Sequence, residues 1–407
     1  MSALIERPLQ SEGSEFAEGW RVVLGANLGI AIGAAITPML AISVFMGALE
    51  HEFGWNRTEI SFGSTIVLAG LAVSAPLIGW LVDRVRAAWI CAVGLIGLSA
   101  AYFGLSQLGA DLRIFYISCA ATALAACGAG TTTFARAVSE SFVRQRGLAL
   151  GIAMVGTGVT AFLMPTLLSP YAAKVGWRAG YRLMSLIVAC GVPVVTLLLA
   201  SAPRSQPRPP SPVDAGPLWQ TRTGRVFWTL AVCFFVIPLS LGGMLVHLLS
   251  FLHDAGVVAT TAGLIAGSAG AMQMVFRVLS GWLVDRVFAP RVAAVMMTTA
   301  AVALALVALL GASVALLAPF AFGLALGAEI DLLGYLTARY FGMRAYGRIY
   351  GLLYAATMIG TALSPVLYGG TYDATGSYRP ALYAGAASLV ISAILFMTLP
   401  SFPEEPA

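Results

Sequence analysis

The chain has 407 residues, of which 59% are hydrophobic and only 10% are charged, and its mean hydropathy is +0.88. Soluble domains carry about 25% charged residues, so this composition excludes a water-soluble globular protein. In hydrocarbon every backbone N–H and C=O must bond within the protein, which leaves helices or closed barrels. The apolar runs are about 20 to 27 residues long and lack strict alternation, which predicts transmembrane helices.

The net charge of +5 and the pI of 9.0 do not indicate a nucleic-acid partner. Only one of the 23 basic residues is a lysine, Lys174, and the arginines gather mainly at helix ends. The five cysteines lie within apolar runs and form no CxxC pair, which indicates packing thiols rather than disulfides. We expect no cofactor and no metal. The first 19 residues hold four glutamates and no apolar core, which predicts a polar tail and not a signal peptide.

In chain order, twelve apolar stretches predict helices. The first six are 21–48, 60–83, 87–108, 113–139, 147–170 and 180–201. The second six are 225–253, 260–283, 290–311, 314–338, 347–370 and 379–400. We therefore expect an all-α membrane protein with twelve transmembrane helices in two six-helix bundles.

The predicted organisation has five parts. They are an N-terminal tail (1–20), an N-terminal bundle (21–201), a linker with six prolines (202–224), a C-terminal bundle (225–400) and a C-terminal tail (401–407). If the N-terminus is cytoplasmic, fifteen arginines fall in cytoplasmic segments and six basic residues fall on the opposite side. This bias predicts a cytoplasmic (inner) membrane protein with both termini in the cytoplasm.

The two predicted bundles repeat each other. The heptapeptide 79–85, Gly-Trp-Leu-Val-Asp-Arg-Val, recurs at 281–287. A second set, Arg144, Gly147, Gly151 and Pro165, matches Arg344, Gly347, Gly351 and Pro365 at nearly the same offset. Two echoes in register indicate parallel repeats related by an axis along the membrane normal.

The repeated GWLVDRV loop resembles the signature between helices two and three of the major facilitator superfamily. A narrower resemblance is to the monocarboxylate transporters and their bacterial relatives, including oxalate/formate exchangers. It rests on Glu18-Gly19-Trp20 before the first helix, on 346–351 (Tyr-Gly-Arg-Ile-Tyr-Gly) and on Arg277 in the eighth helix. Four residues before that arginine the family carries an aspartate, where this chain has Gln273. The resemblance implies a secondary transporter of a small monocarboxylate.

Arg277 lies eight residues before Asp285, which places it about 12 Å into the membrane. A buried arginine is costly there unless it faces protein or water. Its planar fork fits a carboxylate, so it is our main candidate for substrate binding, with Gln273 one turn earlier. The alternative is a structural ion pair with an acid on a neighbouring helix.

Glu329 and Asp331 lie at the same predicted depth, ten and eight residues before Arg339. Two residues apart on a helix means about 200° apart, so one is expected to face a cavity and the other a neighbouring helix. They are candidates for proton coupling, with packing as the alternative. His247 and Asn27 are further candidates for substrate contact, against an interhelical hydrogen bond and a helix kink respectively.

The duplicated loop predicts a gate. Six residues form this candidate latch: Gly79, Asp83, Arg84, Gly281, Asp285 and Arg286. They would hold the outward-open state, and helix capping is the alternative. Arg136 and Glu140 are spaced i,i+4, which favours a helix-stabilising pair.

The leading hypothesis is a secondary active transporter of a small organic anion, a monocarboxylate, coupled to protons and acting as a monomer in the bilayer. One carboxylate is favoured over two because the predicted helix 347–370 has no basic residue beyond Arg348. The alternative is an exporter or exchanger of another small molecule in which Arg277 is structural. A sensor would need an output domain, and an enzyme would need a nucleophile or metal constellation, and neither is present in the sequence.

Overall fold

The computed structural model describes residues 12–33, 36–201 and 222–403, and it is almost entirely helical in these ranges. The N-terminal half consists of α1 (Glu12–Gly33), α2 (Ile36–Phe53), α3 (Arg57–Val82), α4 (Ala87–Leu105), α5 (Leu112–Gly128), α6 (Thr131–Ser141), α7 (Arg146–Leu163), a π-helical turn (Met164–Leu168), α8 (Ser169–Val175) and α9 (Trp177–Ala200). The C-terminal half consists of α10 (Arg222–Asp254), α11 (Ala259–Val284), α12 (Ala289–Leu310), a 3₁₀ turn (Gly311–Val314), α13 (Leu317–Phe341), α14 (Tyr346–Thr375) and α15 (Arg379–Met397).

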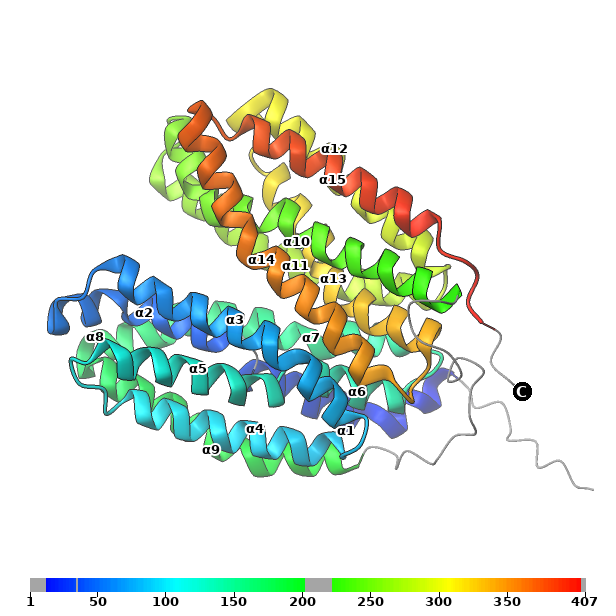
Figure 1. Cartoon of the computed structure of the whole chain (residues 1–407), viewed down its shortest axis with the longest axis horizontal. Helices are drawn as coiled ribbons and strands as arrows, with labels where there is room; N and C mark the ends of the chain where they lie inside the picture. Colours follow the sequence, from blue (N-terminus) through cyan, green and yellow to red (C-terminus); the bar gives the residue numbers. More distant parts are fainter. Residues whose placement is uncertain (1–11, 34–35, 202–221, 404–407) are drawn as a thin grey trace, which may run out of the picture.

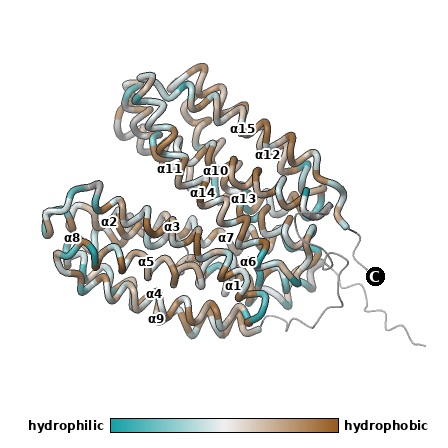
Figure 2. Tube along the Cα trace, viewed as in Figure 1, coloured by the Kyte–Doolittle hydropathy of each residue, from teal (hydrophilic) through white to brown (hydrophobic). Residues whose placement is uncertain are grey.

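The helices have the length and composition of membrane spans. Within the described residues, eleven helical segments are long and apolar enough to cross a bilayer, and Arg146–Ala161 is a shorter apolar helix. Large apolar side chains such as Val73 and Leu264 are 79% and 77% exposed, as expected where the surrounding solvent is lipid. Figure 2 shows hydrophobic residues along the helices and hydrophilic ones mostly toward the helix ends. The chain is an integral, multi-pass membrane protein.

The two halves meet at one end of the molecule and separate toward the other (Figure 1). Across the junction α3 packs against α14, and α7 packs against α11 and α13. The short helix α6 also contacts α13 and α14. The junction is therefore built mainly from the second, fourth and fifth predicted spans of each half, and we call this end of the molecule the closed end.

The predicted span 113–139 is not one helix, which corrects the sequence-based expectation. It is interrupted between α5 and α6, where Ala129 (φ −94°, ψ 24°) and Gly130 (φ −96°, ψ −178°) leave the helical conformation. Glycine is a poor helix former, and Gly128 and Gly130 flank this point. A side chain at Gly94 of α4 would come within 2.7 Å of the Gly128 carbonyl carbon, so α4 packs closely against the break.

Other boundaries differ in smaller ways. The first predicted helix, 21–48, corresponds to α1 and α2, which together reach from residue 12 to residue 53, with 34–35 outside the described residues. The fifth, 147–170, contains a π-helical turn before α8. Most of the predicted linker 202–224 lies outside the described residues, so its role as a divider between two bundles stays a prediction.

Candidate functional site

At the closed end the duplicated loop of each half meets the second repeated motif of the other half. A Cβ added to Gly79 would collide with the backbone of Gly347, and a Cβ added to Gly281 would collide with the backbone of Gly147. Glycine at these positions lets two backbones touch. The heptapeptide of each half therefore contacts the second repeated motif of the other half, which gives two equivalent contacts between the halves.

Each of these contacts is completed by a loop aspartate. Asp83 accepts hydrogen bonds from the backbone N–H groups of Gly347 and Arg348, at 2.7 and 2.8 Å. Asp285 accepts from Gly147 and Leu148, both at 2.8 Å. In each case a carboxylate lies at the N-terminus of a helix, where unpaired N–H groups and the helix dipole favour negative charge. From here on we call Asp83 and Asp285, together with the backbone N–H groups that donate to them, the latch.

Burial shifts the pKa values of the latch carboxyls. It raises the pKa of Asp285 to about 6, although the N–H groups of Leu148 and Gly147 and the charge of Arg146 oppose the shift. Burial also raises the pKa of Asp83, against the hydrogen bond from Arg348 and the charge of Arg136. Both carboxyls are thus held in a site that penalises their charge.

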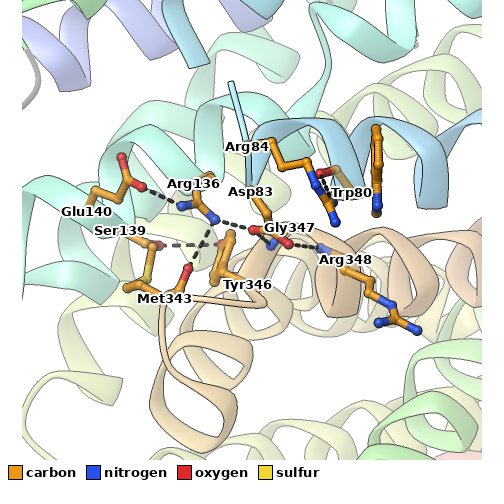
Figure 3. A network of polar contacts seen from close by, with 10 residues as sticks. All are labelled: Trp80, Asp83, Arg84, Arg136, Ser139, Glu140, Met343, Tyr346, Gly347 and Arg348. Carbon is orange, nitrogen blue, oxygen red and sulfur yellow. Dashed lines mark hydrogen bonds and ion pairs between the residues drawn. The ribbon is translucent and has the colours of Figure 1, made fainter. Parts of the chain in front are cut away.

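The Asp83 half of the latch is extended by α6 (Figure 3). Arg136 forms an ion pair with Asp83, and it pairs with Glu140 at 2.8 Å. Its guanidinium also donates to the carbonyl of Met343, at 3.1 Å, across the junction of the halves. The predicted i,i+4 pair of Arg136 and Glu140 is present. The spacing did not predict the other contacts of Arg136, which connect α6 with Asp83 in its own half and with Met343 in the other half.

The arginines that follow the latch aspartates point elsewhere. The guanidinium of Arg84 lies 3.9 Å from the ring centroid of Trp80 and donates to its carbonyl at 3.2 Å. Arg286 repeats this arrangement on Trp282, at 4.2 Å and 3.2 Å. Both arginines are exposed, and their electrostatic effect on the neighbouring aspartates is one of the weaker contributions.

A second site lies deeper, where α11 and α13 bring Arg277 to Asp331, with Glu329 two residues before Asp331 on α13. All three side chains are buried, with exposures of 2%, 3% and 2%. Nη1 of Arg277 lies 3.6 Å from Oδ1 of Asp331, which is an ion pair without a hydrogen bond. The charge of Arg277 acts on both carboxyls. The sequence-based depth estimate thus placed these residues at one level, as the structure does.

The packing of α13 on α11 explains this proximity. A Cβ at Gly323 would meet the side chain of Met272, and a Cβ at Gly327 would meet the backbone of Gln273 at 3.0 Å. Small residues at such spacing let helices approach closely. One turn further along both helices, the same approach brings Asp331 toward Arg277.

The cluster contains many unsatisfied polar atoms. Among the described residues, no hydrogen-bond partner is found for Nε and Nη1 of Arg277, for either carboxylate oxygen of Asp331, or for Oε1 of Glu329. Buried polar groups are normally paired, so these atoms mark a place suited to a polar ligand or to protons. No group of three or more His, Cys, Asp or Glu residues in the described part of the chain could hold a metal ion.

Two further predicted substrate contacts make hydrogen bonds between helices, and their role in substrate binding stays a prediction. Nδ2 of Asn27 donates to the carbonyl of Ile152 at 2.9 Å, so its amide ties α1 to α7. Nε2 of His247 lies 3.1 Å from the carbonyl of Pro365, and Nδ1 lies 3.3 Å from the hydroxyl of Tyr378. Gln273 is half-buried, one turn from Arg277.

The geometry defines a class of protein: two helical bundles that pack against each other at one end, with a buried charged cluster deeper in one of them. A profile of the Major Facilitator Superfamily matches residues 23–352, and the chain belongs to this family of membrane transporters. It is 26% identical over 398 residues to monocarboxylate transporter 13 of Rattus norvegicus, covering 94% of this chain and 89% of the rat protein. It is 35% identical over 160 residues to riboflavin transporter RibJ of Trypanosoma cruzi, covering 39% of this chain and 33% of RibJ.

The fold is also similar to that of the proton:xylose symporter XylE bound to 6-bromo-6-deoxy-D-glucose. The TM-score is 0.72 at 14% identity, over 95% of this chain and 97% of XylE. These findings agree with the predicted all-α major facilitator fold, and the family and the relatives are transporters rather than enzymes.

Proposed function

We propose that this protein is a secondary active transporter that moves a small organic anion, a monocarboxylate, across the cytoplasmic membrane by alternating access. The observation that carries the proposal is Arg277, a residue only 2% exposed, whose Nε and Nη1 have no hydrogen-bond acceptor among the described residues. Full-length relatives named monocarboxylate transporters support this substrate class.

The chemistry of the cluster favours an anion that carries one charge. A guanidinium offers a planar fork of donors that matches a carboxylate bidentately. The ion pair with Asp331 is loose, at 3.6 Å, so a substrate carboxylate has an unsatisfied donor set to bind. Gln273 lies one turn away on the same helix and offers an amide to the rest of the substrate.

Protons are the proposed coupling ion. Glu329 and Asp331 are both buried beside Arg277, and a buried carboxyl is favoured in its neutral form unless a positive charge opposes this. When the substrate carboxylate neutralises Arg277, the two acids lose part of that opposing charge. Substrate binding and proton binding would then support each other, which is the requirement for symport.

The conformational cycle follows from the latch. If both termini are cytoplasmic, as the arginine distribution predicts, the closed end faces the cytoplasm and this is an outward-facing arrangement. Breaking the contacts of Asp83 and Asp285 would open that end. One monomer contains both latch groups and the whole charged cluster, so we propose a functional monomer.

A second candidate has its own observation. The Arg277–Asp331 ion pair is a possible structural contact, and RibJ, a riboflavin transporter, matches part of this chain at 35% identity. The alternative is therefore an exporter or exchanger of another small molecule, with Arg277 holding α11 to α13.

Uptake of labelled lactate, pyruvate, acetate and oxalate into proteoliposomes tests the proposal. Arg277→Lys keeps the charge but loses the fork, so it should weaken binding, and Arg277→Ala should abolish it. Loss of one charged hydrogen bond costs about 1.5–3 kcal/mol, which is roughly a ten- to hundred-fold rise in Kd. Arg113→Ala, at an exposed arginine, is the matched control.

Because Arg277→Ala leaves Asp331 unpaired, the double variant Arg277→Ala/Asp331→Asn provides a second test without the orphaned charge. We expect the double variant to fold and to transport no monocarboxylate. Normal monocarboxylate uptake by either folded variant would overturn the proposed site. If the wild-type protein takes up none of the four anions, the proposed substrate class is wrong.

A further inference from the structure

The break between α5 and α6 leaves a helix N-terminus inside the protein. Thr131, Thr132 and Thr133 form the first turn of α6, and all three are at most 5% exposed. The N-cap residue, Gly130, has no side chain and provides no capping hydrogen bond. The first N–H groups of a helix have no acceptor within that helix, so this end presents donors and the positive end of the helix dipole.

The threonines do not all serve the helix break. Oγ1 of Thr133 donates to the carbonyl of Gly128 at 2.8 Å, which satisfies an acceptor at the end of α5. Oγ1 of Thr131 is different: it is fully buried and has no hydrogen-bond partner among the described residues. The hydroxyl of Tyr350, on α14 of the other half, is also buried and makes no well-formed hydrogen bond in the described structure, although the Thr131 hydroxyl lies close to it.

These unpaired groups lie together and lead to Arg277. The Thr131 hydroxyl is a close polar neighbour of the phenol oxygens of Tyr350 and Tyr354. Tyr354 in turn lies within the electrostatic field of Arg277 and Glu329. Tyr354 of α14 therefore connects the N-terminus of α6, from one half, with the charged cluster, from the other.

The register of the helices agrees with this placement. At the closed end Ser139 of α6 meets Tyr346 of α14, with 3.4 Å between their hydroxyl oxygens. Thr131 lies eight residues before Ser139, and Tyr354 lies eight residues after Tyr346, which is about 12 Å along each helix. Arg277 is also eight residues from its latch residue, Asp285, so counting along the helices predicts one depth for all three groups.

We propose that the N-terminus of α6, with the Thr131 hydroxyl, forms the second arm of the substrate site and binds the carboxylate that Arg277 binds from the opposite side. This inference rests on the proposed function and deepens it, because it assigns the anion to both halves of the protein. One carboxylate oxygen would accept from the guanidinium, and the other would accept from the first-turn N–H groups and hydroxyl of α6. Substrate would then bridge the halves near the junction that must open and close.

Three substitutions at one position test the second arm. Thr131→Val removes the hydroxyl at nearly constant shape, and we expect the Kd for pyruvate or lactate to rise about 3- to 10-fold, the effect of one hydrogen bond. Thr131→Ser keeps the hydroxyl and should retain wild-type affinity. Thr131→Asp places a carboxylate where the substrate's would lie, so binding should be lost while the helix N-terminus tolerates the charge.

The control is Thr122→Val, which deletes another buried hydroxyl on the same span, at α5. Melting temperatures of the substrate-free variants report folding separately from affinity. Wild-type affinity in folded Thr131→Val and Thr131→Asp would overturn the second arm even if Arg277 remains essential. Absence of carboxylate binding by the wild-type protein would instead overturn the proposed function, so the two failures are distinguishable.

Discussion

The glycine contacts of the latch allow a perturbation that leaves every charged group in place. In Gly347→Ala, the new methyl group would collide with the carbonyl oxygen of Gly79 and with the side chain of Val82, and would lie 3.0 Å from Oδ1 of Asp83. The first obstacle is backbone of a packed helix, so it cannot rotate away. The start of α14 must instead move away from α3.

The cost of that movement follows from the bonds it breaks. Displacing the start of α14 separates Asp83 from the N–H groups of Gly347 and Arg348, which it now holds at 2.7 and 2.8 Å. A hydrogen bond to a charged group contributes about 1.5–3 kcal/mol, so the closed state loses about 3–6 kcal/mol. A loss of only 3 kcal/mol changes a two-state ratio by roughly 150-fold. We therefore expect the closed end to be mostly open.

Labelling measures this directly. A single cysteine at position 139 replaces a serine that is 1% exposed, in a background without the five native cysteines, and a membrane-impermeant thiol reagent reports its exposure. Gly347→Ala should label much faster than its parent. The matched control is Gly370→Ala on the same helix, where an added Cβ meets no other atom. If Gly347→Ala labels and transports like the control, the close approach does not hold the latch.

Three further predictions concern the carboxyls. Asp83→Asn and Asp285→Asn each replace a carboxylate that accepts two N–H bonds by an amide with one acceptor oxygen. Transport should fall severalfold while the protein still folds. Wild-type transport rates in both variants would contradict a role for these residues in the latch. Burial raises the pKa of Asp285 to about 6 in the closed state, and opening would return this pKa toward about 3.9. The closed state therefore binds protons more readily, and acidification from pH 7.5 to 5 favours it. Labelling at position 139 should slow on acidification, and faster labelling would contradict this. Glu329→Gln or Asp331→Asn, whichever removes the coupling group, should still exchange substrate but not accumulate it against a pH gradient, and full accumulation in both would return these acids to packing.

Composition, periodicity and repetition were enough to predict the fold and to single out residues that lie at the closed end, but not the contacts between the two repeated motifs. The heptapeptide 79–85 and its copy at 281–287 lie in equivalent loops, and Gly147 and Gly347 lie in the second echo. Identical backbones at equivalent places can make identical contacts, and the structure shows both. Counting along helices from the membrane surface also worked for Arg277 and Asp331, because the rise per residue is nearly constant in helices.

Other features depended on contacts that no periodicity encodes. The break at 128–130 is not predicted, because glycines are common in all the apolar stretches of this chain. Two glycines followed by three threonines nevertheless indicate a helix interruption and a new first turn. Asn27 and His247 are polar residues in apolar helices, and such residues bind whatever acceptor or donor the neighbouring helix presents. Their partners are carbonyls of α7 and α14, and the sequence does not show which helices are neighbours.

Two helices join the proposed substrate site to the latch, and each carries a residue of both. On α11, Arg277 belongs to the charged cluster, and Asp285 follows at its C-terminal end. On α6, Thr131 begins the helix and belongs to the proposed second arm, whereas Arg136 contacts Asp83 and Met343 at the closed end. A helix of this length moves as a rigid element. An anion that draws the start of α6 toward α11 must therefore also move Arg136, and this movement changes the contacts of Arg136 with Asp83 and Met343. Coupling between the two sites therefore needs no long pathway: it needs only that the two arrangements of α6 differ in their affinity for the anion.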